Sequence, residues 1–160
     1  KNMPLIEPVE TKENLRIEEL VIVVDTSYST SGELVKKFLR ETFTILSETD
    51  SFFRKRKIHI IQCDELVHSD ITVTGDTDID ILINNFDLAG GGNTDFRPAF
   101  EYVNNLIDTG EIKKLQGLLY FTDGKGKYPK KKMPYNTAFV FIDKLSETAV
   151  PAWAMKVSLE

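Results

Sequence analysis

The side chains best suited to chemistry in this sequence are carboxylates and hydroxyls that lie in three short polar segments. The five candidates are Asp25, Ser27, Ser29, Thr94 and Asp123. The first three occupy alternate positions, so a loop leaving a strand can direct all three oxygen atoms toward one point. The other two come from segments much later in the chain, so the fold must bring them to the same place.

This set of ligands predicts a site for a hard divalent cation. Two carboxylates and three hydroxyls suit Mg²⁺ or Mn²⁺, whereas zinc sites favour His nitrogen and Cys sulfur. Two carboxylates balance the charge of one divalent ion. Because Mg²⁺ requires six ligands in octahedral geometry, at least one position should stay open for water or an incoming carboxylate. We therefore expect the metal to bind an exposed Asp or Glu of a partner protein.

Apolar runs and helical periodicity predict the elements that must position these side chains. The run Leu20-Val-Ile-Val-Val24 is typical of a strand buried on both faces. The break Asp64-Glu65 is too short for a crossover helix, so the strands around it should form an antiparallel hairpin. We expect strands at 20–24, 57–63, 66–73, 117–122, 137–142 and 153–157, and helices at 33–48, 78–86 and 96–107.

This order of elements predicts an α/β fold. The sheet should be mostly parallel and doubly wound (Rossmann-like), with helices on both faces and one antiparallel edge strand. In such sheets functional groups gather at the carboxyl ends of the strands, where all three polar segments fall. The glycines of Gly90-Gly-Gly92 should permit a tight turn that brings Thr94 to the metal.

Three segments carry a family resemblance. The D-x-S-x-S loop, the later Thr in a Gly-rich loop and the Asp of T-D-G resemble the metal-ion-dependent adhesion site (MIDAS) of von Willebrand A (VWA) domains. The stretches 25–32, 90–98 and 121–129 are more specifically similar to the C-terminal VWA-like domain of a bacterial family described as metallopeptidases. The resemblance runs from Leu20 to the end of the chain. It implies direct coordination by Ser27, Ser29 and Thr94, with Asp25 and Asp123 acting directly or through water.

Two departures from the family pattern predict an altered domain. Tyr28 stands where glycine is usual, which adds bulk at the rim of the site. The segment 125–136 is rich in Lys and Pro and should not form the helix that a full VWA domain has there. We therefore expect a VWA-like fold that is trimmed in its C-terminal half.

Length and composition place these segments in one domain. With 160 residues, 41 % of them hydrophobic, the chain can bury a core of ordinary size. We interpret residues 1–19 as a linker or edge extension and 20–160 as the VWA-like domain. The start at Lys1 indicates the C-terminal part of a longer polypeptide. We expect the single cysteine, Cys63, to be a small buried apolar side chain, and the lack of a second cysteine fits a cytoplasmic protein. No apolar run approaches the roughly 20 residues that span a membrane.

Enzymatic functions find little support in the motifs. His59 and His68 are not part of an H-E-x-x-H motif, so we expect this chain not to be an enzyme, with any peptidase chemistry encoded upstream. No G-x-S-x-G elbow is present either. The main enzymatic alternative is phosphoryl transfer of the haloacid-dehalogenase type, but its D-x-D motif requires an acid where Ser27 stands.

Nucleic acid is the remaining alternative partner. The net charge of −5 argues against general binding to nucleic acids or anionic membranes. A local exception is a basic stretch beside Asp123, which could serve as an RNA-binding module. Its members are Lys125, Lys127, Lys130, Lys131 and Lys132.

Simple structural roles compete with each candidate segment. Thr30, with Glu33 three residues later, forms a capping box that explains part of the first loop without any metal. Asp95 can be a ligand or can cap the following helix, and we prefer the cap. Acidic residues 76, 78 and 80 lack the pattern of a calcium loop, so solvation and capping suffice for them.

Overall fold

The computed structural model describes residues 17–27, 32–49, 55–141 and 150–158. These residues form one sheet with the strand order β3-β2-β1-β4-β5-β6, in which every neighbouring pair is parallel except β2 and β3. The strands are β1 (Ile17–Asp25), β2 (Lys55–Cys63), β3 (Val67–Val73), β4 (Leu115–Thr122), β5 (Asn136–Phe141) and β6 (Met155–Ser158). The helices are α2 (Gly32–Thr49), α3 (Ile79–Asn84) and α4 (Arg97–Asp108). The predicted mostly parallel α/β sheet with an antiparallel edge strand is confirmed.

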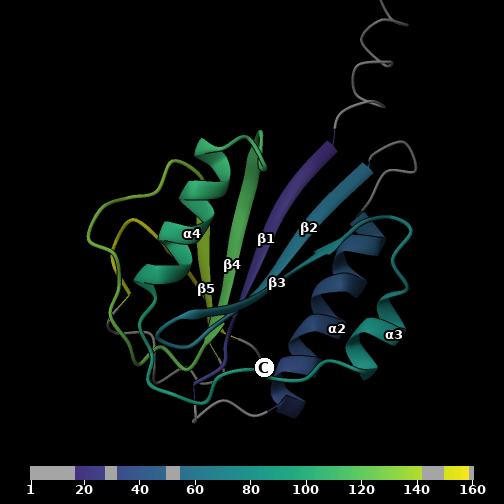
Figure 1. Ribbon diagram of the computed structural model, residues 1–160, viewed down its shortest axis with the longest axis horizontal. Coiled ribbons are helices and arrows are strands. Elements are labelled where there is room, and N and C mark those ends of the chain that lie inside the picture. Colours follow the sequence, from purple (N-terminus) through teal and green to yellow (C-terminus); the bar gives the residue numbers. More distant parts are fainter. Residues whose placement is uncertain (1–16, 28–31, 50–54, 142–149, 159–160) are drawn as a thin grey trace, which may run out of the picture.

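Helices cover both faces of this sheet, with α4 on one side and α2 and α3 on the other (Figure 1). Successive residues of β1 point to opposite faces, so Val21 and Val23 join the core under α4, whereas Ile22 and Val24 join the core under α2. This double burial explains why β1 is apolar without alternation. Among the described residues, no helix has the length and apolar character needed to cross a membrane.

The first strand is longer than its apolar run. It begins at Ile17, so three residues of the predicted linker, 17–19, belong to β1. Glu19 is buried there, and one of its carboxylate oxygens accepts the backbone N–H groups of Lys113 (2.8 Å) and Lys114 (2.9 Å). These bonds fix the chain as it enters β4. Local sequence patterns cannot predict a buried carboxylate whose partners are so distant in the sequence.

The connection from β4 to β5 contains no helix, as the sequence predicts. Side chains of this connection cover the α4 face directly, and the Tyr128 ring packs against Phe96 (4.6 Å between centroids) and Phe139 (4.9 Å). Trp153, just before β6, donates from Nε1 to the Pro129 carbonyl (3.3 Å). Aromatic packing therefore replaces the helix on this part of the sheet.

Several smaller predictions concern single residues. Asp78 caps α3, since its carboxylate accepts the Ile81 N–H at 3.1 Å. Cys63 is buried, and burial raises the pKa of its thiol to about 12, which keeps it protonated and unreactive at neutral pH. The proposed capping box of α2 involves Thr30, which lies outside the described residues.

A partly buried polar network joins β2, β3 and α4. Asp70 contacts His59 Nδ1 at 2.9 Å and accepts the Tyr102 hydroxyl at 2.6 Å. Burial alone would raise the pKa of Asp70, but the bonds from His59 and Tyr102 outweigh it, so this pKa lies below its usual value of 3.8. The ionised carboxylate is thus favoured more in the folded than in the unfolded state.

This network gives a pH-dependent prediction for Asp70→Asn. A lowered folded-state pKa contributes stability above pH 3.8 that is lost as the pH falls through the folded-state value. At neutral pH we expect the variant to lose about 1.5–3 kcal/mol of unfolding free energy, the usual contribution of a hydrogen bond to a charged group. Urea titrations should show the difference from wild type narrowing in acid. An equal difference at all pH values, or a similar loss in the exposed control Asp76→Asn, would contradict the assignment.

Candidate metal centre

Asp25 lies at the carboxyl end of β1, fully buried between the loops that follow β1 and β4. Its Oδ1 accepts the Ser27 N–H at 2.8 Å, and its Oδ2 accepts the Thr122 hydroxyl at 2.5 Å. Thr122 Oγ1 in turn accepts the Gly124 N–H at 3.0 Å. The Ser27 side chain also hydrogen-bonds the Asp25 carboxyl. The two loops are thus joined through the Asp25 carboxylate.

The surroundings of Asp25 disfavour its negative charge. Burial raises the pKa of Asp25, hydrogen bonds from Thr122 and Ser27 oppose this rise, and the negative charge of Asp123 adds to it. No ion pair between described residues involves Asp25. Asp25 and Asp123 therefore lie in one region of the molecule, and no ion pair among the described residues offsets the charge of Asp25.

The glycine-rich loop lies against the loop after β1. Gly90 and Gly91 both have positive φ, +126° and +100°, in the region that other residues rarely adopt. Gly91 N–H donates to the Thr26 carbonyl at 2.8 Å, and a Cβ at Gly90 would lie only 2.7 Å from Thr26 Oγ1. The sequence therefore requires glycine here for both conformation and close approach.

Thr94 is delivered by this loop to the neighbourhood of Asp123. A Cβ at Gly126 would lie 2.7 Å from Thr94 Cγ2, so the threonine packs against the segment that follows β4. Asp123 belongs to that segment, is partly exposed, and accepts the Lys125 N–H at 3.0 Å. The loops that carry Asp25, Thr94 and Asp123 thus converge at one edge of the sheet.

The rest of the predicted set is described only in part. Ser27 is buried beside Asp25, but Ser29 and the rim residue Tyr28 lie outside the described residues. Within the described chain, no group of three or more His, Cys, Asp or Glu side chains can hold a metal. A cation at this edge would therefore depend on hydroxyl ligands.

Asp95 lies beside this edge but has a structural role. Its Oδ1 accepts the Arg97 N–H at 3.0 Å, and both of its oxygens bind the Arg97 guanidinium at 2.9 and 2.8 Å. The bonds from Arg97 lower the pKa of this carboxyl. The helix cap proper is Phe96, which makes no side-chain cap bond. Asp95 therefore serves the start of α4 from one residue earlier than expected.

Asp64 was not identified from the sequence as part of the site, yet it holds the glycine-rich loop. It is buried, and its carboxylate accepts the N–H groups of Gly92 (3.0 Å) and Leu66 (2.9 Å) and contacts His68 Nε2 at 2.8 Å. Its carbonyl accepts the Asp95 N–H at 3.2 Å. Burial raises the pKa of Asp64, but the bonds from Leu66, Gly92 and His68 bring it below the usual value.

Gln62, two residues before Asp64, holds the segment that leads into the glycine-rich loop. It is buried at the end of β2, donates from Nε2 to the Asp87 carbonyl (3.0 Å) and accepts the Ala89 N–H at 2.7 Å. The available signal for Gln62 was a polar side chain between the apolar residues Ile61 and Cys63. Asp64 resembled an ordinary turn residue, so its role is visible only in three dimensions.

We predict that Asp64→Ala weakens divalent-cation binding without removing a ligand. The change leaves the Gly92 and Leu66 N–H groups without their acceptor and frees the loop that carries Thr94. Replacing a residue that positions metal ligands without binding the metal typically lowers metal affinity by about 10-fold to 100-fold. Calorimetric titration of Mg²⁺ should show this loss, whereas the exposed neighbour Glu65→Ala, with the same change in charge, should bind normally. Unchanged affinity in Asp64→Ala would refute the positioning role.

The fold and the convergent loops define an α/β domain of the VWA type. A family model described as a VWA-like domain (DUF2201) matches residues 20–160, and the chain belongs to this family. The resemblance to VWA domains inferred from the sequence is thereby confirmed.

Solved structures of other proteins share the fold. The chain is similar to the SpRpn10 VWA domain, with a TM-score of 0.57 and 12 % identity over 90 % of this chain and 88 % of that chain. It is also similar to a multiply mutated aerotolerance-related membrane protein from Bacteroides fragilis NCTC 9343. There the TM-score is 0.52 and the identity 14 %, over 78 % of this chain and 67 % of that chain. No curated protein matches the chain.

Proposed function

We propose that this domain binds Mg²⁺ or Mn²⁺ and uses the metal to dock a protein that presents an exposed Asp or Glu. The ligands would be Asp25, Ser27, Ser29, Thr94 and Asp123, either directly or, for the two acids, through water. The single observation that carries the proposal is the buried Asp25 carboxylate, which lies close enough to Asp123 to feel its charge and has no described cationic partner.

The described residues support this role through preorganisation. Asp25 is held by Ser27 N–H and Thr122 Oγ1, so its carboxylate need not reorient to meet a cation. Hydroxyl ligands add no charge, so a bound ion would keep electrophilic character toward a partner carboxylate. We infer a binding role without catalysis in this chain. One candidate partner is an upstream, metallopeptidase-related part of the same polypeptide.

The metal-binding half of the proposal is tested by calorimetry. Mg²⁺ and Mn²⁺ should bind wild type with a stoichiometry of one, and Asp123→Ala and Ser27→Ala should each weaken binding strongly. Asp76→Ala removes an exposed acid outside the site and is the matched control. Equal binding by all of these proteins would refute the proposed site.

The docking half is tested with a carboxylate-bearing probe. A labelled peptide containing one Asp should bind in Mg²⁺ and be released by EDTA, whereas its Asn counterpart should not bind. Fluorescence anisotropy measures both. Binding that persists in EDTA would show that the metal does not mediate the contact.

A further inference from the structure

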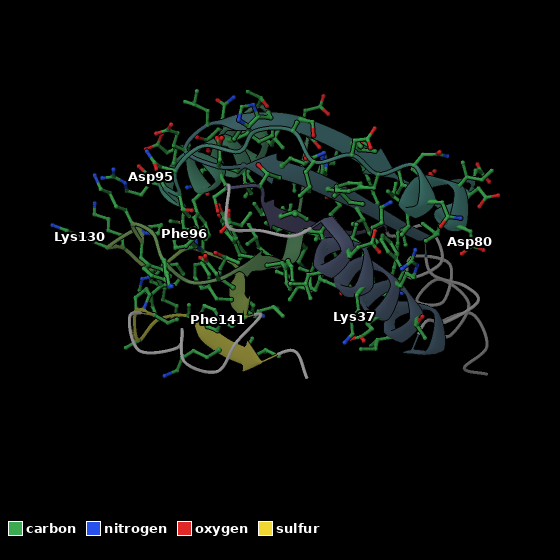
Figure 2. The ribbon with its side chains drawn as sticks, turned by 90° about the horizontal axis from the view of Figure 1, so that it is seen from below. Lys37, Asp80, Asp95, Phe96, Lys130 and Phe141 are labelled. Carbon is green, nitrogen blue, oxygen red and sulfur yellow. The ribbon has the colours of Figure 1, made fainter. Side chains whose placement is uncertain are left out.

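The segment directly after Asp123 exposes a concentrated positive charge. Residues 125–132, here called the lysine loop, contain five lysines and no acid, although the whole chain carries a net charge of −5. All five side chains are exposed: Lys125, Lys127, Lys130, Lys131 and Lys132. Figure 2 shows Lys130 at the same end of the molecule as Asp95, with Lys37 farther away.

The backbone of the lysine loop is fixed from beneath. Tyr128 donates its hydroxyl to the Gly124 carbonyl at 3.0 Å, and its ring packs in the aromatic core beside Phe96. The Lys127 carbonyl accepts the Phe96 N–H at 3.0 Å, and the buried Pro129 accepts the Trp153 indole N–H. A solvated run of charge does not require such anchoring. Here four contacts hold the loop beside the candidate metal centre.

The lysine loop begins next to the candidate metal centre. Lys125 N–H binds the Asp123 carboxylate, so the lysine loop begins at one of the proposed ligands. A partner whose carboxylate reached a metal at this place would therefore lie next to the start of the lysine loop. Positive charge at that place attracts negatively charged partners and accelerates their association.

We propose that the lysine loop is a second contact for the partner and selects a protein segment with several acidic residues around the metal-binding carboxylate. This inference rests on the proposed function. A protein fits better than RNA, because Tyr128 packs inward and is not available to stack on bases.

The test compares charge reversal in the lysine loop with reversal elsewhere. The variant Lys130→Glu/Lys131→Glu/Lys132→Glu is matched by Lys36→Glu/Lys37→Glu/Lys113→Glu, which changes the same charge outside the loop. The probes are a labelled short poly-glutamate peptide, a peptide with a single Asp, and a single-stranded RNA of equal length. Fluorescence anisotropy is measured in Mg²⁺ and in EDTA, at low and moderate salt.

We expect the loop variant to lose about tenfold or more in affinity for poly-glutamate, since each exposed ion pair contributes modestly and three are reversed. The single-Asp peptide and the control variant should change much less. Equal loss in both triple variants, or tighter wild-type binding of RNA than of poly-glutamate, would overturn the inference. Metal-dependent binding with the same affinity in the loop variant and in wild type would overturn the inference about the lysine loop but would be consistent with the proposed function. Binding that is lost on loop reversal but persists in EDTA would support a role of the lysine loop in binding and would contradict metal-mediated docking.

Discussion

Replacing Asp25 by Asn should abolish Mg²⁺ binding and leave the metal-free protein at least as stable as wild type at neutral pH. Asn keeps an oxygen that can accept the Ser27 N–H, and its amide nitrogen can donate to Thr122 Oγ1 in place of the bond that Thr122 now donates. The change also removes a buried negative charge next to that of Asp123. Because burial raises the folded-state pKa of Asp25, ionisation opposes folding once the pH exceeds that value. Below the unfolded-state pKa the carboxyl is neutral in both states, so the advantage of Asn should disappear in acid.

Added metal should reverse the order of stability. A ligand at 100 times its Kd stabilises the folded state by about 2.7 kcal/mol, and only wild type should gain this amount from Mg²⁺. Urea unfolding of both proteins, with Mg²⁺ and with EDTA, measures the effect. Asp76→Asn, which changes the same charge at an exposed position, should follow wild type. If Mg²⁺ stabilised Asp25→Asn as strongly as wild type, Asp25 would not be part of a metal site.

Replacing Phe96 by Ala should cause the largest loss of stability. The ring is fully buried and contacts Tyr120 (5.0 Å between centroids), Tyr128 (4.6 Å) and Phe139 (5.6 Å). Removing a buried Phe ring usually costs about 3–5 kcal/mol, because a cavity is left as well as the transfer energy lost. Since a Cβ at Gly126 would touch both this ring and Thr94, the cavity should also loosen the site.

Chemical denaturation tests this prediction against two graded controls. Phe96→Leu keeps most of the volume and should cost less, roughly 1–3 kcal/mol. Ile81→Ala removes a side chain that is 60 % exposed and should change stability by less than about 0.5 kcal/mol. A Phe96→Ala protein no less stable than Ile81→Ala would show that the aromatic cluster does not hold the trimmed half together.

The predictable parts of the fold are the elements whose burial produces a recognisable hydrophobic pattern in the local sequence. The continuous apolar run at 20–24 indicated a central strand, and the short break at Asp64-Glu65 indicated the hairpin. The absence of a helix after β4 followed from the Lys and Pro content of that segment. What replaces this helix is a set of ring contacts between distant residues, which no local pattern contains.

For the candidate site, the sequence indicated which loops converge, but it did not indicate which contacts hold those loops. Alternating oxygens in the first loop and the glycines at 90–92 marked the loops that do converge. The supporting residues Gln62, Asp64 and Thr122 were missed, because a polar side chain at a strand end looks the same whether it meets water or a distant backbone group. Their roles depend on pairing between β1, β2 and β4, which is a property of the whole sheet.

A crystal structure of the full chain grown with Mn²⁺ tests the central claim most directly. The account predicts one strong anomalous peak at the carboxyl edge of the sheet, within coordination distance of oxygen atoms from the loops of Asp25, Thr94 and Asp123. The same map would show Ser29 and Tyr28 relative to the ion. A fully ordered edge with no anomalous peak, or a peak confined to another acidic surface, would contradict a metal-dependent docking site.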